Sequence, residues 1–573
     1  MKDLSHADLV IRNARVLNSY IKKFVDADIF IKDGKFLYVD TKKQNEITAD
    51  EEINASGKYI IPGFIDIHMH IESSLVTPRA FADYTVSRGL TTIVSEPHEI
   101  ANVCGKAGIN AMIKDGQKAP YDVYYAIPSN VPVMKDHETA GAELTCDDML
   151  ELKNTDGIWC LGEVMNYKEI IQENDSEVGK FIDIVHEKDP NYILEGHCPQ
   201  LKYADLARFL YRGITSDHCE HDLEEIRQRF ENGMFVQIQD MMLKKEIIDY
   251  IIDNSLYEYF SFVTDDTFPD LLVKNGHIDN IVRKAIRLGM KPEYAIYCAT
   301  YTPAARMNMR DRGVIAPGKL ADFVIIDDPC ELSILATFKR GKQIYDITEG
   351  IKKHDYSLGK EFEQTVKLSI PDIARFSVFV PGKDREVSVR VMEVSCNTNI
   401  TSERRVRMRV IGNILQWQET DCRLVMVFER HGINGNVSYG FACGDCLKTG
   451  AVASSLSHDS HDLIVMGCNE EDMHKAVKEV ISMNGGIVSV LDGKVTGTLA
   501  LPVAGLMSNR SVEETADDFI RIRKAFEDQG YVHRNTIMNF CLLALTCVPY
   551  LRLTDKGYLD TENIRMVPLY EEI

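Results

Sequence analysis

The sequence predicts an α/β protein built around a (β/α)8 TIM-like barrel, with a discontinuous small β-domain and a C-terminal α+β domain. Three observations lead to this fold class. Short apolar runs alternate with longer helical patterns between residues 61 and 312, which is typical of parallel βα units. Hairpin-like segments flank that region at residues 1–60 and 313–369, and mixed strand and helix patterns follow over residues 370–573.

The two flanking segments share one pattern of short apolar runs separated by polar residues. Near the start of the chain, Leu9-Val10-Ile11 and Ile29-Phe30-Ile31 are short apolar runs, and the second leads into Lys32-Asp33-Gly34-Lys35. Such runs, separated by Gly and Asp, predict β-hairpins. The same pattern returns at residues 313–327. We therefore expect one β-domain that is assembled from both sides of the central region.

Eight apolar runs in the central region are strand candidates. They lie at residues 60–67, 92–95, 124–127, 159–164, 192–195, 214–216, 235–238 and 260–264. Eight strands in about 250 residues is the number found in a (β/α)8 barrel, although a doubly wound sheet produces a similar alternation. Beyond residue 370, strand-like runs at 387–394, 405–411, 424–428 and 487–491 mix with helical patterns at 471–483 and 511–528. That mixture predicts a separate α+β domain.

Composition and charge limit the partners. The 573-residue chain carries a formal net charge of −22, with 87 acidic against 65 basic residues. Nucleic acids and anionic membranes bind positive surfaces, so we expect neither as a partner. The 14 cysteines show no paired framework, and the first residues have no apolar core of a signal peptide. These features predict a cytoplasmic protein, and for a large enzyme of this kind we expect a homodimer.

Metal-binding residue types recur where the predicted strands end. The first strand ends in His68 and His70, which alternation on an extended chain points to the same side. Later strand ends carry Glu163, His197, His218 and Asp265. In a barrel these ends meet at one rim, where catalytic groups lie. Imidazole and carboxylate ligands admit Mn²⁺, Fe²⁺ or Zn²⁺, so the set predicts a binuclear divalent metal centre bridged by Glu163.

Two further polar segments allow more than one interpretation. His98 and Glu99, beyond the second strand, either contact the ring nitrogens of a substrate or cap the following helix and support the metal ligands. His458-Asp459-Ser460-His461, together with Glu429-Arg430-His431-Gly432, is either a lid over the barrel mouth or a further metal site. Of these two interpretations we favour the lid.

The arrangement resembles the amidohydrolase superfamily, whose entry and exit segments are similar to 62–68 and 317–322 of this chain. More closely, the chain resembles the bacterial adenine deaminase family. The similar stretches are Pro97-His98-Glu99, Gly162-Glu163-Val164-Met165-Asn166, Gly196-His197, Ser216-Asp217-His218, Thr264-Asp265-Asp266, Gly276-His277-Ile278-Asp279, 450–455 with His458-Asp459-Ser460-His461, and 501–508. This resemblance implies metal-dependent hydrolytic deamination of adenine to hypoxanthine and ammonia in purine salvage and adenine catabolism, with Mn²⁺ (manganese) or Fe²⁺ as the expected ions.

The expected catalytic residues follow from this chemistry. Asp265 is a metal ligand that also lies within reach of the attacking water, so we expect it to take the water proton and pass it to the leaving amine. Glu163 would bridge the two ions, and His98 and Glu99 would assist at the ring.

Three positions differ from the family's usual residues. Glu96 stands where the family has Asp, Cys219 follows His218 where the family has Glu, and residues 235–240 lack the usual Arg and Gly. We expect Glu96 and Gln239 to contact the substrate, along with His98 and Glu99. The differences leave two alternatives open: an aminohydrolase or amidohydrolase acting on another nitrogen heterocycle, and a catalytically silent metal-binding homologue.

Overall fold

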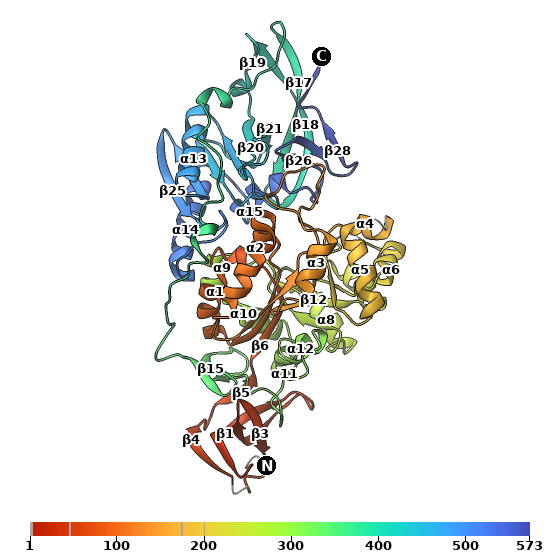
Figure 1. Ribbon diagram of the computed structural model, residues 1–573, viewed down its shortest axis with the longest axis vertical. Helices are drawn as coiled ribbons and strands as arrows, with labels where there is room; N and C mark the ends of the chain where they lie inside the picture. The colour runs from red at the N-terminus through yellow and green to blue at the C-terminus, as the bar shows by residue number, and fades with distance from the viewer. Residues whose placement is uncertain (1–3, 45–46, 173–175, 200) are drawn as a thin grey trace.

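The central part of the chain forms a curled parallel sheet inside a mixed α/β fold (Figure 1). The computed structural model describes residues 4–44, 47–172, 176–199 and 201–573. Its parallel strands form one sheet in the order β10-β9-β8-β7-β6 and a second in the order β11-β12-β13. The bounds are β6 (Phe64–Met69), β7 (Leu90–Ser95), β8 (Asp122–Ile127), β9 (Ile158–Val164), β10 (Leu194–Gly196), β11 (Ser216–Asp217), β12 (Phe235–Ile238) and β13 (Phe260–Phe262).

Contacts at both edges bring the two parallel sheets together. The Gly196 amide at the end of β10 donates to the Ser216 hydroxyl at the start of β11, at 3.3 Å. At the opposite edge, the Asp265 amide donates to the His68 carbonyl at 3.1 Å, and Met69 and Asp265 form a parallel bridge. The carboxyl ends of the first and last strands are therefore neighbours.

The first predicted strand is in fact two strands. Residues 60–67 divide at Gly63 into β5 (Tyr59–Pro62) and β6. β5 pairs with the antiparallel β14 (Phe323–Ile326), whereas β6 pairs with the parallel β7. A Cβ on Gly63 would lie 2.3 Å from the Thr91 side chain, so the chain crosses between the two sheets at a position that accepts only glycine. A continuous apolar run could not reveal that change of sheet.

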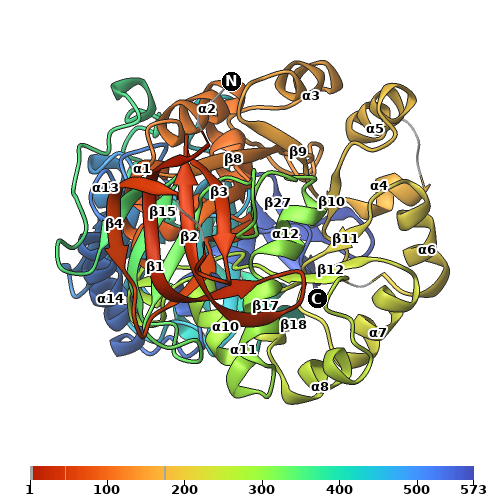
Figure 2. The same cartoon turned by 90° about the horizontal axis from the view of Figure 1, so that it is seen from below.

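Helices cover the outside of the parallel strands (Figure 2). They are α1 (Pro78–Thr85), α2 (His98–Gly116), α3 (Cys146–Lys153), α4 (Tyr167–Gln172), α5 (Glu177–Lys188), α6 (Tyr203–Tyr211), α7 (Leu223–Glu231), α8 (Lys245–Asp253), α9 (Pro269–Asn275), α10 (Ile278–Arg287), α11 (Pro292–Tyr297) and α12 (Tyr301–Arg306). α7 shows why such a segment is helical: Asp222 and Glu225 form a reciprocal capping box at its start, and Ile226 is buried on its inner face.

One mixed, mainly antiparallel sheet combines strands from both ends of the central region. Its order is β16-β15-β14-β5-β1-β2-β3, and β4 pairs with β1. The remaining bounds are β1 (His6–Asn18), β2 (Lys23–Lys32), β3 (Lys35–Asp40), β4 (Thr48–Asn54), β15 (Ile334–Lys339) and β16 (Lys342–Asp346). Phe323 and Phe338 stack across β14 and β15, with ring centroids 4.4 Å apart. The sheet lies at the end of the molecule where the parallel strands begin (Figure 1).

The last third of the chain contains a large mixed sheet in the order β19-β18-β17-β21-β20-β23-β22-β24-β25, with β29 on β17, and a small sheet β26-β27-β28. The strands are β17 (Arg385–Ser395), β18 (Thr398–Ile411), β19 (Ile414–Leu415), β20 (Arg423–Phe428), β21 (Val437–Gly444), β22 (Ala451–Ser454), β23 (Leu463–Gly467), β24 (Gly486–Leu491), β25 (Lys494–Ala500), β26 (Leu551–Thr554), β27 (Gly557–Asp560), β28 (Arg565–Val567) and β29 (Tyr570–Glu572). The helices are α13 (Glu470–Ser482), α14 (Val512–Asp528) and α15 (Thr536–Cys541). The strand and helix runs predicted beyond residue 370 match these elements, with the two helical runs each extending one residue past α13 or α14.

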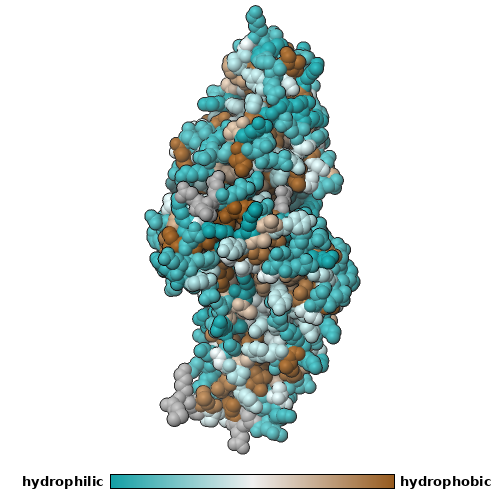
Figure 3. All heavy atoms as spheres, turned by 90° about the vertical axis from the view of Figure 1, so that its right-hand side faces the viewer, coloured by the Kyte–Doolittle hydropathy of each residue, from teal (hydrophilic) through white to brown (hydrophobic). Residues whose placement is uncertain are grey.

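This C-terminal part packs against the end of the molecule where the parallel strands finish (Figure 1). Phe519 of α14 stacks on Phe268, with ring centroids 4.8 Å apart, and the Ser508 amide donates to the Leu75 carbonyl at 2.7 Å. The carboxyl ends of β6 and its neighbours are thus covered by residues that come much later in the chain. The face drawn in Figure 3 is mainly hydrophilic, with apolar residues in scattered groups. Among the described residues, no helix has both the length and the apolar character to cross a membrane.

Candidate functional site

His68 and His70 meet Asp265 where β6 and β13 end. His68 Nε2 lies 3.7 Å from Asp265 Oδ1, and His70 Nε2 lies 3.4 Å from the same oxygen. The alternation expected along β6 therefore points both rings to one side of the strand. Asp265 itself has a left-handed backbone, with φ of 55°, which is uncommon for a residue with a Cβ.

Glu163, at the carboxyl end of β9, is the centre of the cluster. Its Oε2 lies 2.8 Å from His197 Nδ1 and 3.0 Å from His218 Nε2, and its Oε1 lies 3.5 Å from His70 Nε2. One carboxylate thus contacts histidines that follow three different strands. The structure brings together all of the residues predicted as ligands: His68, His70, Glu163, His197, His218 and Asp265.

The donor set fits divalent ions. His68 Nε2 and His218 Nδ1 are buried, and no described residue hydrogen-bonds to either atom. Buried polar atoms of this kind are nearly always partnered in folded proteins. Potential ligand atoms of His68, Glu163 and His218, and again of His68, His70 and Asp265, lie within 4.8 Å of one another. Neutral imidazole and carboxylate groups are the usual ligands of Mn²⁺, Fe²⁺ and Zn²⁺.

The charges of the cluster favour the ligand forms of its acids. Burial alone would raise the pKa of Glu163, but the charges of His197 and His218 hold it well below its usual range. Burial likewise raises the pKa of Asp265, but the nearby His68 and His70 rings outweigh burial and hold that pKa well below its usual range. Burial lowers the pKa of His68 to about 4. Both carboxylates are therefore ionised and His68 is neutral near pH 7. Against the opposing effect of burial, the charge of Glu163 raises the pKa of His197 to about 9, so this histidine must lose a proton when it binds a metal.

Gln239 holds Asp265 in place. Its Nε2 donates to Asp265 Oδ2 at 2.9 Å and to the His218 carbonyl at 3.0 Å. The amide nitrogen that we expected to contact a substrate is thus bonded to Asp265. Thr264, one residue earlier, donates to Asp66 Oδ2 at 2.6 Å and contacts His277 Nε2 at 3.0 Å. Together these bonds orient the strand end that carries Asp265.

His98 and Glu99 begin α2 beside the cluster. His98 Nδ1 lies 3.6 Å from Glu163 Oε1, and His98 Nε2 lies 3.9 Å from Asp459 Oδ1. In the described structure, Pro97, which precedes α2, makes no side-chain capping bond. A side chain from outside the helix caps it instead, since Glu72 Oε1 accepts from the Ile100 amide at 3.4 Å. His98 and Glu99 therefore face the site, and helix capping does not explain them.

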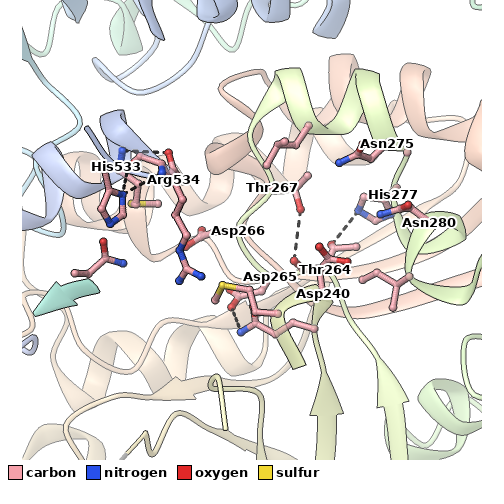
Figure 4. Close-up of a pocket in the computed structure, with 18 of the residues that line it drawn as sticks. Asp240, Thr264, Asp265, Asp266, Thr267, Asn275, His277, Asn280, His533 and Arg534 are labelled. Carbon is pink, nitrogen blue, oxygen red and sulfur yellow. Dashed lines mark hydrogen bonds between the residues drawn. The ribbon is translucent and has the colours of Figure 1, made fainter. Parts of the chain in front are cut away.

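A cavity of about 410 Å³ opens onto Asp265 (Figure 4). From the parallel-strand part it is lined by Gln239, Asp265 and Asp266, among others. From the C-terminal part it is lined by Asn399, His533, Arg534, Asn535, Met538 and Leu542. In Figure 4, His533 and Arg534 approach the cavity from the side opposite His277 and Asn280. The C-terminal part thus supplies one wall of the space beside the candidate metal ligands.

Comparisons with known proteins agree over nearly the whole chain. The amidohydrolase family matches residues 59–348, and the adenine deaminase C-terminal domain matches residues 398–565. An adenine deaminase of Clostridium perfringens is 42% identical over 570 residues, which cover 98% of this chain and 100% of that protein. The adenine deaminase 2 of Shouchella clausii is 39% identical over 568 residues, which cover 99% of each chain. The chain belongs to the adenine deaminase family.

Among solved structures, an enamidase of the amidohydrolase superfamily is 17% identical, with a TM-score of 0.45 and coverage of 59% of this chain and 96% of that chain. Membership of the adenine deaminase family confirms the resemblance noted from the strand-end motifs. It also implies a divalent metal at the active site, and the cluster around Glu163 and Asp265 contains suitable ligands.

Glu96, one of the positions that differ from the family's usual residues, lies inside the parallel sheet. Its carboxyl group faces Gly162 on β9, and a Cβ added to Gly162 would lie 1.4 Å from Glu96 Oε2. Both carboxyl oxygens are buried without a hydrogen bond from the described residues. Burial, followed by the neighbouring Glu163 charge, raises the pKa of Glu96 well above its usual range. Burial thus favours the protonated form of this side chain, which lies next to the Glu163 carboxylate.

Gly162→Ala is expected to lower the free energy of unfolding by about 1–3 kcal/mol, because the new methyl group overlaps the Glu96 carboxyl. Glu96→Asp in the same chain retracts that carboxyl by one methylene and should recover part of the loss. Urea unfolding of the two single variants and the double variant measures the coupling. If the double variant loses as much as the sum of the single variants, Glu96 is not the group that excludes a side chain at position 162.

The sequence reasoning missed Glu72. It continues the alternation of His68 and His70 beyond β6, and that spacing is the signal that could have found it. Burial, together with the charge of Glu99, raises the pKa of Glu72 to about 8, and its Oε2 has no hydrogen-bond partner in the described part of the chain. Glu72 therefore adds another carboxyl group to an already acidic site.

Proposed function

We propose that the protein catalyses the hydrolytic deamination of adenine to hypoxanthine and ammonia in purine salvage. The observation that carries the proposal is the meeting of four histidines and two carboxylates around Glu163 and Asp265, in a chain that aligns with adenine deaminases over its full length. The reaction breaks one C–N bond of a cyclic amidine. Water supplies the oxygen of the new carbonyl group. One of its protons leaves with the amine as ammonia, and the other remains on the ring.

We propose His68, His70, Glu163, His197, His218 and Asp265 as ligands of two divalent ions, with Mn²⁺ or Fe²⁺ preferred over Zn²⁺. Bound ions of this kind lower the pKa of water toward neutrality and so provide a nucleophile at pH 7. Glu163 is suited to bridging them because its two oxygens face different histidines, His197 and His218 on one side and His70 on the other.

Asp265 moves the proton in this proposal. Its Oδ1 faces His68 and His70, and its Oδ2 accepts from Gln239, so the carboxylate is held ionised beside the cavity. It takes one proton from the attacking water and passes it to the leaving amine. Gln239 acts through Asp265, by fixing the direction of that carboxylate.

His98, Glu99 and Glu96 complete the proposed machinery. His98 and Glu99 lie at the start of α2 next to Glu163, where they bind ring nitrogens and deliver the ring proton as C6 becomes tetrahedral. Glu96 lies beside Glu163, where we propose that it contacts the substrate. The C-terminal wall of the cavity excludes bulk water from the reacting group.

The fold assignments that accompany this function are a closed (β/α)8 barrel at 61–312, a β-domain from 1–60 and 313–369, and a C-terminal domain at 370–573. The eight parallel strands and the Met69–Asp265 bridge support closure of the barrel. We propose a cytoplasmic homodimer that acts on free purine and binds neither nucleic acid nor membrane.

Removal of the metal tests the proposal directly. Protein treated with a chelator should lose at least about 10²-fold of its adenine deaminase activity, because an unassisted water molecule is a poor nucleophile. Adding Mn²⁺ under reducing conditions should restore the activity, with hypoxanthine and ammonia formed in equal amounts. The measurement is ammonia release alongside separation of the purines.

Two results would contradict the proposal. Deamination of another nitrogen heterocycle, with adenine untouched, would support the alternative substrate suggested by Glu96 and residues 235–240. Occupied metal sites and bound adenine without turnover would identify a silent homologue.

A further inference from the structure

A second cluster of metal-binding side chains lies between α2 and the C-terminal part. Glu99 comes from the start of α2, whereas His458 and His461 come from the segment between β22 and β23. One potential ligand atom from each lies within 4.8 Å of the other two. All three residues are buried, with exposed fractions of 3% for Glu99, 8% for His458 and 0% for His461.

The distances in this cluster suit a shared ion better than direct hydrogen bonds. Glu99 Oε1 lies 3.7 Å from His458 Nδ1, and Glu99 Oε2 lies 3.6 Å from His461 Nε2. Hydrogen bonds between such atoms are shorter, at about 2.7–3.2 Å. Two ligands that are each about 2.1 Å from one ion lie roughly 3.0–3.7 Å apart, depending on the angle between them.

The His461 ring lies edge-on to the His458 ring, with centroids 5.4 Å apart. Its side chain is completely buried, and neither Nδ1 nor Nε2 has a hydrogen-bond partner among the residues that the structure describes. Its backbone is firmly held, since the Arg430 guanidinium donates to the His461 carbonyl and His431 Nε2 contacts the Ser460 carbonyl at 2.8 Å. Buried ring nitrogens normally have a hydrogen-bond or metal partner. A cation bound between this imidazole and the carboxylate that it faces would supply that partner.

The surrounding charges also favour a cation. Asp459 Oδ1 lies 3.3 Å from His458 Nδ1. Ser73 Oγ donates to Asp266 Oδ1 and, at 3.4 Å, to Glu99 Oε1, so Asp266 lies close to the same group. Glu99, Asp459 and Asp266 thus place three carboxylates around His458, with the buried His98 3.9 Å from Asp459.

We propose that Glu99, His458 and His461 bind a divalent cation, for which zinc is the best match, in addition to the ions proposed at Glu163 and Asp265. Two histidines and one carboxylate are a known zinc ligand set. Asp459 is placed to supply a further oxygen. The ion links the segment that carries His458 and His461 to the start of α2, and so holds the C-terminal part in place over the active site. This site goes beyond the proposed deaminase function. It shares Glu99 with that function, so in the zinc-bound protein the delivery of the ring proton falls to His98 alone.

Metal counting tests the proposal. Metal-free protein is titrated with Zn²⁺, freed of excess metal by gel filtration and analysed by mass spectrometry of the elements. We expect three equivalents per chain for the unaltered protein and two for His461→Gln, because only one ion loses a ligand. His354→Gln is the matched control, since His354 is a partly exposed histidine paired with Asp83, and it should keep three.

Two equivalents in the unaltered protein, or three in His461→Gln, would overturn the proposal. If His461→Gln fails to fold, His458→Gln serves as the second variant, and anomalous scattering at the zinc edge from crystals of the unaltered protein must show a peak between Glu99 and His461. Absence of that peak also overturns it. A peak there with none at Glu163 would instead contradict the proposed deaminase centre, so the two failures are distinguishable.

Discussion

Asp265→Asn should lower kcat for adenine deamination by about 10³- to 10⁴-fold, the upper part of the range for loss of a general acid or base. The amide cannot accept the water proton, although it keeps nearly the same size. It can still accept from Gln239, so the strand end should hold its position. The measurement is steady-state ammonia release, with the metal content of the same sample determined in parallel.

Asp253→Asn provides the control for this change. Asp253 is exposed at the end of α8, and its amide variant should retain the activity of the unaltered protein within about twofold, as expected for surface substitutions. If Asp265→Asn keeps more than a tenth of the activity with its metal in place, Asp265 is not the group that moves the proton.

Glu163→Gln should remove at least one metal ion per chain and lower activity by about 10³-fold or more, because an activated water and its positioning are lost together. The carboxylate contacts His197 and His218 through one oxygen and His70 through the other. Replacing it by an amide leaves those histidines without their shared anion. Elemental analysis and the adenine assay measure the two effects on one preparation.

Glu246→Gln is the matched control for Glu163→Gln. Glu246 lies exposed in the first turn of α8, and its variant should match the unaltered protein in both metal content and activity. A Glu163→Gln protein with a full complement of metal and unchanged turnover would contradict the bridging role.

Much of the candidate site could be predicted because it depends on where strands end. The pair His68 and His70 shows a two-residue period, which on an extended chain places both rings on one face. Glu163, His197, His218 and Asp265 each follow an apolar run. Parallel strands finish at a common edge, so a local pattern was enough to group residues that are distant along the chain.

Other features could not be predicted, since they depend on how separate elements pack. The run at 60–67 is continuous and apolar, yet it divides at Gly63 because Thr91 of the neighbouring strand approaches too closely for a Cβ. Gln239 was expected to contact a substrate and lines the cavity, but the hydrogen bond from its amide nitrogen to Asp265 was not foreseen. Both outcomes are set by distances between strands, which no single segment encodes.

The sequence by itself determined the family, the order of the strands, and the residue types at their ends, because periodicity and motif spacing are local properties of the chain. Only the tertiary structure decided which of those side chains touch one another. Glu96 against Gly162, and Glu99 against His458 and His461, are pairs whose partners belong to different strands or different parts of the molecule. Such contacts follow from the packing of one layer on another, where a shift of one residue would separate every pair.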